Sequence, residues 1–327
     1  MLVTLDDIRA AASRIRGVAR RTPVLEIPIE RRGGPRRGGP SGPPSDPPTL
    51  ALKCENFQTS GAFKVRGACN MLAQLPAEAR AAGVITYSSG NHGQAVALVA
   101  RSLGMSAVIV MPETAARVKV DGVRHFGAEV IFAGTTSGDR KARAEEVAAA
   151  RGLTIVPPFD HPWIIAGAGT VGLEILEQCP QATTVFVPMG GGGQISGVSA
   201  AVKGMRASVR VVGVEPAGAA RMSASLAAQC PITLEQSSSI ADGLLTLRPG
   251  DLTFAHVQAH VDEVVTVDDA EMIAAVKWLF HEAHVVAEPS GAAATAAALR
   301  AGSPGAVAVV SGGNVDPVKY AAYIGGA

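Results

Sequence analysis

Residues 184–194 read TVFVPMGGGGQ, a short apolar run followed by four consecutive glycines. A short, continuous apolar run is typical of a strand that is buried on both faces of a parallel sheet. The sequence after the glycines, residues 194–203, is compatible with a helix. A strand, a glycine-rich loop and a helix in this order predict a unit of an α/β fold.

The same alternation extends outward from this unit in both directions. Alanine-rich stretches such as 142–150 and 292–299 separate several short apolar runs. The other strand-like runs are 50–53, 84–87, 107–110, 129–132, 210–214 and 306–310. We therefore predict an α/β fold with a mainly parallel, doubly wound sheet arrangement. In such folds ligands bind where strands end and the following loops begin.

The composition of the 327 residues fits a globular protein that binds a small molecule. Hydrophobic residues make up 47% and charged residues 17%, which provides a large core and excludes global disorder. The 29 Lys and Arg residues nearly balance the 28 Asp and Glu residues, so the formal net charge is +1. This even balance gives no indication of a nucleic-acid or membrane partner.

Cysteine usage and the N-terminal sequence predict a cytoplasmic location. The four cysteines form no C-x-x-C pair, so neither a zinc knuckle nor a disulfide framework is indicated. Asp6 and Asp7 lie where a signal peptide has its apolar run. The longest apolar stretch, 95–111, is interrupted by Arg101 and Gly104, so we do not expect it to span a membrane.

One segment differs in composition from the rest of the chain. Residues 31–48 (RRGGPRRGGPSGPPSDPP) contain no apolar side chain other than proline, so this segment cannot bury surface. We expect a disordered-like Gly/Pro/Arg loop. Its four arginines also suggest nucleic-acid binding, but no aromatic residues lie among them, and a solvated loop is the favoured interpretation.

The four glycines at 190–193 predict a site for a phosphate group. Main-chain N–H groups without side chains can converge on an anion at the start of a helix. No Lys-Ser or Lys-Thr pair follows, so we expect a phosphate monoester rather than a nucleotide P-loop, with a tight turn as the alternative.

A second glycine pattern, residues 167–172 (GAGTVG), matches the dinucleotide-binding motif. Prolines interrupt the segment before it, and no acidic residue follows about twenty positions later. We therefore interpret it as a helix-packing turn.

Two further segments carry groups suited to Schiff-base formation and to carboxylate binding. Lys64 lies among small and apolar residues, where loss of solvent would lower its pKa and free the amine for Schiff-base formation. Asn91, His92 and Gly93 follow a predicted strand and could bind a carboxylate at a helix N-terminus. Capping of that helix is a compatible alternative.

Six motifs together resemble one known family. Residues 55–68 (ENFQTSGAFKVRGA) are similar to the lysine segment of the pyridoxal-phosphate-dependent threonine/serine dehydratases and serine racemases, a tryptophan synthase β-like family of fold type II. The other five motifs follow in the family's order: 88–94 (SSGNHGQ), 190–193 (GGGG), 240–243 (IADG), 287–291 (AEPSG) and 311–314 (SGGN). The resemblance covers nearly the whole chain except residues 31–48.

This resemblance implies two doubly wound domains with pyridoxal 5'-phosphate in the cleft between them. Residues 1–80 and 156–327 would form the large cofactor-binding domain, and residues 81–155 the small domain that closes over the substrate. The implied cofactor-binding residues are Phe63, Lys64, Asn91, Gly190, Gly191, Gly192, Gly193 and Ser311. The implied substrate-binding residues are Ser88, Ser89, Asn91 and His92.

The implied activity is β-elimination of water from a β-hydroxy amino acid of the L-threonine or L-serine type, which gives a 2-oxo acid and ammonia. Lys64 would be the general base. The alternative is a serine racemase with side dehydratase activity, in which Ser89 would be the acid/base on the opposite face. β-Replacement is less favoured, because VRG (65–67) follows the lysine and the asparagine loop reads SGNH (89–92) rather than SGNT. A cofactor-free binding protein is less favoured, because Lys64, the glycine loop and Ser311 are all present. Members of the family are usually homodimers.

Three positions depart from the family pattern. Family members often hold a cation near the glutamate of residues 213–216 (GVEP), but Arg221 lies close by and its positive charge would oppose a metal ion. We therefore expect no metal site. Ala168 stands where glutamine is usual, and Gln194 replaces an apolar residue, so we expect an unusual substrate preference.

Overall fold

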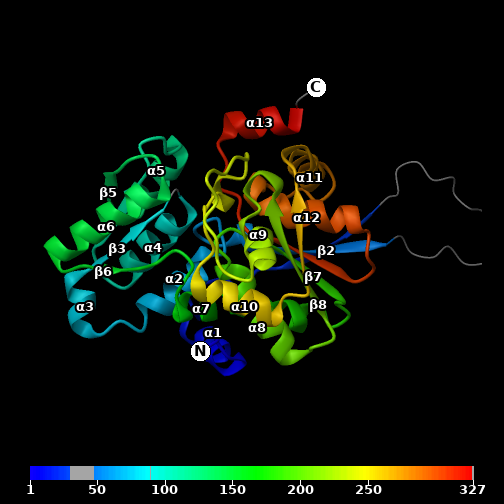
Figure 1. Cartoon of the computed structure of the whole chain (residues 1–327), viewed down its shortest axis with the longest axis horizontal. Helices are drawn as coiled ribbons and strands as arrows, with labels where there is room; N and C mark the ends of the chain where they lie inside the picture. Colours follow the sequence, from blue (N-terminus) through cyan, green and yellow to red (C-terminus); the bar gives the residue numbers. More distant parts are fainter. Residues whose placement is uncertain (30–47, 89, 326–327) are drawn as a thin grey trace, which may run out of the picture.

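The computed structural model describes residues 1–29, 48–88 and 90–325. The predicted Gly/Pro/Arg loop lies, apart from Pro48, outside these residues, and so does Ser89. The described chain contains two β-sheets with helices packed around them (Figure 1).

The larger sheet has six strands in the order β1-β2-β10-β7-β8-β9. β1 pairs antiparallel with β2, and all other neighbouring strands are parallel. The strands are β1 (Val24–Pro28), β2 (Thr49–Cys54), β7 (Thr184–Pro188), β8 (Arg210–Pro216), β9 (Glu263–Val267) and β10 (Ala306–Val310).

The smaller sheet has four parallel strands in the order β5-β4-β3-β6. They are β3 (Val84–Tyr87), β4 (Ala107–Met111), β5 (Glu129–Phe132) and β6 (Thr154–Ile155). Every strand-like run of the sequence lies within a strand, which confirms the prediction of an α/β fold with mainly parallel sheets. β1, β6 and β9 were not predicted.

Helices connect most of the parallel strands, as this topology requires. The α-helices are α1 (Leu5–Arg14), α2 (Lys64–Leu72), α3 (Ala77–Ala82), α4 (Asn91–Ser102), α5 (Arg117–His125), α6 (Ser137–Arg151), α7 (Pro162–Gln178), α8 (Gly193–Met205), α9 (Arg221–Ala228), α10 (Asp251–His260), α11 (Asp269–His281), α12 (Pro289–Ala301) and α13 (Pro317–Gly325). Three short 3-10 helices are η1 (Glu55–Phe57), η2 (Ala217–Ala219) and η3 (Asp242–Leu244).

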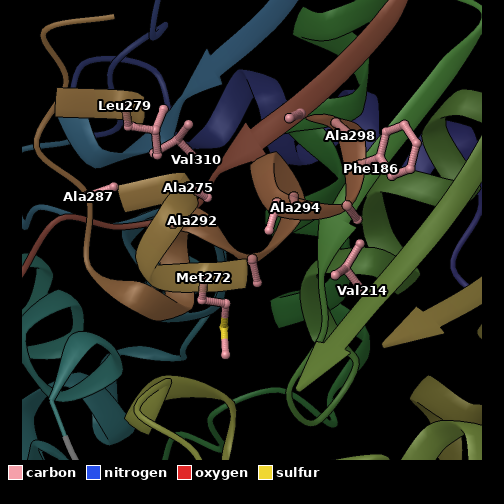
Figure 2. Close-up of a cluster of buried hydrophobic side chains, with 14 of the residues drawn as sticks. Phe186, Val214, Met272, Ala275, Leu279, Ala287, Ala292, Ala294, Ala298 and Val310 are labelled. Atoms are coloured by element: carbon pink, nitrogen blue, oxygen red, sulfur yellow. The ribbon is translucent and has the colours of Figure 1, made fainter. Parts of the chain in front are cut away.

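Strand β10 shows how both faces of the larger sheet are covered. Ala306, Ala308 and Val310 belong to a core that includes residues of α11 and α12. Figure 2 shows this core, in which small alanine side chains of α12 lie close to the sheet. Val307 and Val309 belong to a second core with residues of α7 and α8. The alternation follows from the two-residue period of a strand.

The smaller sheet is covered in the same way. One core contains buried residues of α2, α4 and α5 together with β4, and another contains residues of α6 with β3 and β4. Helix α2 therefore lies at the junction of the two sheets, since it belongs to the smaller sheet's core and also packs against α7.

The second glycine pattern lies in the interior of α7, so its interpretation as a turn was wrong, although its role in helix packing is confirmed. A Cβ atom on Gly197 of α8 would lie 2.2 Å from the carbonyl oxygen of Ile165 and 2.4 Å from the nitrogen of Gly169. Two helices can approach this closely only where side chains are absent. This contact positions α8 and the loop before it.

Cys54, Cys69 and Cys179 are buried as free thiols, and Cys230 is exposed. In the described part of the chain, no helix combines the length and the apolar character that crossing a bilayer requires.

Candidate active site

A cavity of about 560 Å³ lies between the elements of the two sheets. Residues at the carboxyl ends of β3, β4, β7 and β10 line it. A doubly wound fold is expected to bind ligands at these strand ends. The predicted site residues that line it are Phe63, Lys64, Ser88, Asn91, His92, Gly190, Gly191, Gly192, Gly193 and Ser311. The structure thus brings together all the predicted site residues that it describes; Ser89 lies outside them.

The glycine loop presents unpaired main-chain N–H groups. The carbonyls of Met189 and Gly190 accept hydrogen bonds from Arg221 (3.2 and 2.6 Å), and that of Gly191 accepts one from the Thr253 hydroxyl (2.7 Å). Because C=O and N–H point in opposite directions across a trans peptide, the three N–H groups that follow these carbonyls point away from Arg221 and Thr253. Among the described residues these three N–H groups have no acceptor.

Only glycine fits most of this loop. A Cβ on Gly191 would lie 2.5 Å from the ring of Phe159, and a Cβ on Gly193 would lie 2.9 Å from the same side chain. Gly192 has φ +99°, a conformation that other residues rarely adopt. Since Gly193 also begins α8, the loop combines free N–H groups with a helix N-terminus. These donors fit a phosphate group.

Lys64 is the first residue of α2, and its side chain lines the cavity. Its Nζ donates a hydrogen bond to the carbonyl of Pro158 (2.7 Å) and lies 5.1 Å from the ring centre of Phe63. Burial lowers the pKa of Lys64 to about 8, in agreement with the expectation from its apolar sequence neighbours. A substantial fraction of the amine is therefore neutral at mildly alkaline pH, as Schiff-base chemistry requires.

The N-terminus of α4 offers a second group of donors. The helix begins at Asn91, so the N–H groups of Asn91, His92 and Gly93 have no acceptor within it. The hydroxyl of Ser88 accepts a hydrogen bond from the N–H of Gly90 (3.1 Å) and holds the loop that leads into the helix. Among the described residues these N–H groups have no acceptor, and such donors fit a carboxylate.

The side chain of His92 does not contribute to these donors. Its Nε2 lies 3.2 Å from the carbonyl oxygen of Val156, and its Nδ1 is buried with no partner in the described part of the chain. Burial, and then the charge of Lys64, lower the pKa of His92 to about 3, so the ring is neutral. The proton therefore lies on Nε2, facing the carbonyl, and only the main-chain N–H of His92 is suited to a carboxylate.

Ser311 follows β10 and connects two of the motifs. Its carbonyl accepts a hydrogen bond from the N–H of Phe63 (3.0 Å), which fixes the residue next to Lys64. Its hydroxyl lines the cavity and makes no hydrogen bond with the described residues. It is available to a ligand.

A polar cluster that sequence reasoning missed crosses the cavity. Asn91 donates a hydrogen bond to Glu288 and accepts one from Asn314 (2.9 Å). Lys119 of α5 contacts both Asp242 (2.5 Å) and Glu288 (3.4 Å). The cluster joins elements of the smaller sheet to elements of the larger sheet.

Burial and mutual attraction act against each other in this cluster. Burial raises the pKa of Glu288, although Lys119 and Asn91 oppose the shift. Burial also disfavours the charge on Lys119, but Glu288 and Asp242 outweigh it and raise the pKa of this lysine. Asp242 and Glu288 belong to motifs that carried the family resemblance, whereas Lys119 lies outside every motif and no sequence signal marked it.

Two more side chains line the cavity with unused donors. Arg140 donates to the carbonyl of Thr135 and the hydroxyl of Ser137 (both 3.2 Å), while its Nε has no partner within the described ranges. Gln194 is 4% exposed, and its Nε2 also lacks a partner there. Gln194 and Ala168 line one small void beside Lys64, so the two departures from the family pattern meet at one place.

Comparison with known proteins agrees with this geometry. The family model described as "Pyridoxal-phosphate dependent enzyme" matches residues 41–312. The chain is 40% identical to the L-threonine ammonia-lyase of Thermotoga maritima over 321 residues, which are 96% of this chain and 76% of that protein. It is 37% identical to the serine racemase of Schizosaccharomyces pombe over 328 residues, or 99% of this chain and 98% of that protein.

Solved structures give the same result. The structure of maize serine racemase superimposes with a TM-score of 0.89 at 37% identity, and the match covers 98% of this chain and 96% of the maize chain. The chain spans about half the length of the biosynthetic L-threonine dehydratases that it matches.

Proposed function

Since the chain belongs to the family of pyridoxal-phosphate-dependent enzymes, we propose that it is an ammonia-lyase that removes water from a β-hydroxy amino acid. The products are a 2-oxo acid and ammonia. One observation carries the proposal: a buried lysine with a pKa of about 8 shares one cavity with a phosphate-type glycine loop and a carboxylate-type helix N-terminus. The ammonia-lyases among its relatives support the direction of the chemistry.

The residues present fit the cofactor. Lys64 supplies the amine, and Gly190, Gly191, Gly192 and Gly193 supply main-chain N–H groups for the phosphate. Phe63, Asn91 and Ser311 line the same cavity. By the family resemblance, Phe63 would lie beneath the ring, Asn91 would bind its hydroxyl and Ser311 would face its nitrogen. When bound, pyridoxal phosphate withdraws electrons from an attached amino acid and acidifies its Cα–H bond.

Lys64 then acts as the general base at the substrate's α-carbon. Its neutral Nζ accepts the α-proton, and the carbonyl of Pro158 orients the amine. Among the described residues no carboxylate opposes the effect of burial, so the pKa of Lys64 stays low, at about 8. An ion pair would hold the amine protonated and unable to accept a proton.

The N-terminus of α4 binds and orients the substrate carboxylate. The N–H groups of Asn91 and His92 donate to the carboxylate oxygens, and Ser88 holds the N–H of Gly90 just before the helix. The family resemblance assigns Ser89 to the same carboxylate. The buried helix end strengthens these bonds. Holding the carboxylate there turns the Cα–H bond toward Lys64.

Ser311 favours elimination. A neutral hydroxyl at the ring nitrogen does not enforce a positive charge there, as a carboxylate would. Negative charge that develops at the α-carbon is therefore stabilised less strongly, which favours prompt loss of the β-hydroxyl over transamination.

A second candidate function is racemisation. The serine racemases of Schizosaccharomyces pombe and maize are 37% identical to this chain over 99% and 98% of its length. In this candidate Ser89 returns a proton to the face of the α-carbon opposite Lys64. We place it second because the ammonia-lyase of Thermotoga maritima has the higher identity.

We further propose a homodimer in the cytoplasm. The free cysteines support a reducing compartment. The nearly even balance of 29 basic and 28 acidic residues supports the absence of a nucleic-acid or membrane partner. The subunit number rests on the family resemblance and is tested by measuring the mass of the purified protein in solution.

The test is a substrate panel on cofactor-loaded protein. L-Threonine, L-serine and L-threo-3-hydroxyaspartate are incubated with the enzyme, and release of 2-oxo acid and of the D-enantiomer is measured. We expect 2-oxo acid from at least one substrate and none from the Lys64→Ala variant. The Lys277→Ala variant serves as the lysine control. D-Amino acid without 2-oxo acid would establish the racemase instead. If neither product is released, both functions are refuted.

A further inference from the structure

Arg221 is fully buried, yet its guanidinium is surrounded by main-chain carbonyl oxygens. One terminal nitrogen donates to the carbonyls of Met189 (3.2 Å) and Gly190 (2.6 Å). The other donates to the carbonyls of Ala219 and, at 2.6 Å, Leu244. The four N–H bonds of the two terminal nitrogens are thus all used, and each acceptor is an uncharged oxygen, while the N–H of Nε has no partner among the described residues.

These four carbonyls belong to three separate segments. Met189 and Gly190 begin the glycine loop after β7, Ala219 ends η2 after β8, and Leu244 ends η3. Gly190 and Leu244 line the cavity. A single cation therefore joins the glycine loop to the two segments beside it.

The same oxygens do not fit a metal ion, although the family resemblance implies one near residues 213–216. Both carboxylate oxygens of Glu215 accept hydrogen bonds from the first turn of α9, from the N–H groups of Met222 (3.0 Å) and Ser223 (2.9 Å). In the described ranges no group of three or more His, Cys, Asp or Glu residues could hold a metal. Carbonyl and carboxylate oxygens are the ligands of calcium and magnesium, and here Arg221 and α9 occupy them.

We propose that Arg221 is a positioning residue that replaces a bound metal ion and fixes the glycine loop in its phosphate-binding geometry. The inference rests on the proposed function only in taking the phosphate to be that of pyridoxal phosphate. By holding the carbonyls of Met189 and Gly190, Arg221 directs the N–H groups of Gly190 and Gly191 toward the opposite side.

Arg221 retains its charge in this position. Burial lowers the pKa of Arg221 to about 10, and the nearby Glu215 opposes the shift. The guanidinium is therefore positive at neutral pH. Because it is part of the chain, chelators cannot remove it, in contrast to a bound ion.

The first experiment uses the wild-type protein. Apoenzyme is treated with EDTA and desalted, and the dissociation constant of pyridoxal phosphate is measured by fluorescence titration with and without added magnesium or calcium chloride. We expect the same constant in all samples. If adding either ion changes the dissociation constant about tenfold or more, the proposal is overturned, since a bound metal ion would then be stabilising the phosphate-binding loop.

The second experiment removes the guanidinium. In Arg221→Ala we expect the dissociation constant of pyridoxal phosphate to rise at least about tenfold, because hydrogen bonds to a charged group are lost and the loop carbonyls lose their donor. Guanidinium chloride at low, non-denaturing concentration restores part of the affinity. Urea, which has a similar shape but no charge, does not.

The matched control is Arg206→Ala. Arg206 also donates to a main-chain carbonyl, that of Pro180, but lies at the other end of α8. Its substitution leaves cofactor affinity unchanged. Wild-type affinity in Arg221→Ala, or equal rescue by urea, would refute the positioning role.

If Arg221→Ala cannot be purified, Arg221→Lys and the wild-type measurement decide the question. Lysine keeps the charge but cannot donate to four carbonyls in one plane. We expect intermediate cofactor affinity, and wild-type affinity would refute the role of the fork. All these experiments measure cofactor binding, so their outcome does not depend on the substrate. If the cofactor affinities change as expected but the substrate panel gives no product, the proposed function is contradicted and this inference stands.

Discussion

The ammonium of Lys119 lies 2.5 Å from a carboxylate oxygen of Asp242, and this contact joins α5 of the smaller sheet to η3 of the larger sheet. The Lys119 side chain is 5% exposed, so the contact is protected from solvent although Asp242 is half exposed. The same ammonium also contacts a carboxylate oxygen of Glu288, at 3.4 Å. Lys119, Asp242 and Glu288 all line the cavity. Because their contacts join elements of the two sheets, the sheets can move apart only if these contacts break.

Lys119→Met tests the cluster. Removing the cation leaves Glu288 buried beside Asp242 without its positive partner, which costs about 3 kcal/mol of folding free energy. We expect a lower melting temperature and a rise in KM, because the two sides of the cavity are no longer held together around the substrate. Lys141→Met is the control, since the pair that Lys141 forms with Glu145 is exposed on both sides. Equal effects of both substitutions would contradict the prediction.

The pH dependence of cofactor binding tests the state of Lys64. Burial lowers its pKa from the ordinary lysine value to about 8, so the protonated form dominates below that pH and the neutral amine above it. Only the neutral amine reacts with an aldehyde. We expect the rate at which apoenzyme develops the absorbance of bound pyridoxal phosphate to rise with pH through about 8 and then level off. A profile still rising steeply at pH 10 would show that Lys64 is not desolvated.

Gln194→Leu tests the unpaired amide beside Lys64. The buried Nε2 of Gln194 has no acceptor among the described residues, and an unpaired donor of this kind costs about 1–3 kcal/mol. Leucine has a similar volume and no donor, so we expect the apoenzyme to become more stable and to bind pyridoxal phosphate less tightly. Thermal unfolding with and without cofactor measures both effects. A less stable apoenzyme would show that the amide already has a partner.

Gly191→Ala tests the shape of the glycine loop. The added Cβ would lie 2.5 Å from the Phe159 ring, so either the ring or the loop must move. We expect at least about a tenfold loss of cofactor affinity, since the N–H groups then miss the phosphate. Gly138→Ala is the control, because the nearest atom to its Cβ would be 3.6 Å away. Unchanged affinity in Gly191→Ala would mean that Phe159 can turn aside freely.

The sequence predicted the strands whose residues are buried on both faces, such as those of β7 and β10, because their apolar runs are continuous. It did not indicate β1, whose residues are only partly buried at an antiparallel edge and which ends at Pro28, or β6, which has two residues. In these strands the pairing depends on neighbouring strands that are distant in sequence.

The site was predicted to a similar extent. Lys64, the glycine loop and Ser311 follow strands or belong to glycine-rich motifs, so local sequence marked them. Lys119 and Arg140 come from helices with ordinary sequences, and their importance arises only where the smaller sheet approaches the larger one. The sequence indicated the charge of Arg221 near residues 213–216, but neither its place beside the glycine loop nor its bonds to four carbonyls, because the direction of a carbonyl is a property of the folded backbone.

The hydrogen bonds that Arg221 and Thr253 make to the glycine loop also determine at which step the loop loses its backbone conformational entropy. Glycine has the greatest backbone freedom of all residues, and four in succession would leave a free loop highly variable. Here three successive carbonyls are already bonded on the outer side, so that freedom is lost when the chain folds rather than when a ligand arrives. The loop is preorganised, and an incoming phosphate meets donors that are already aligned.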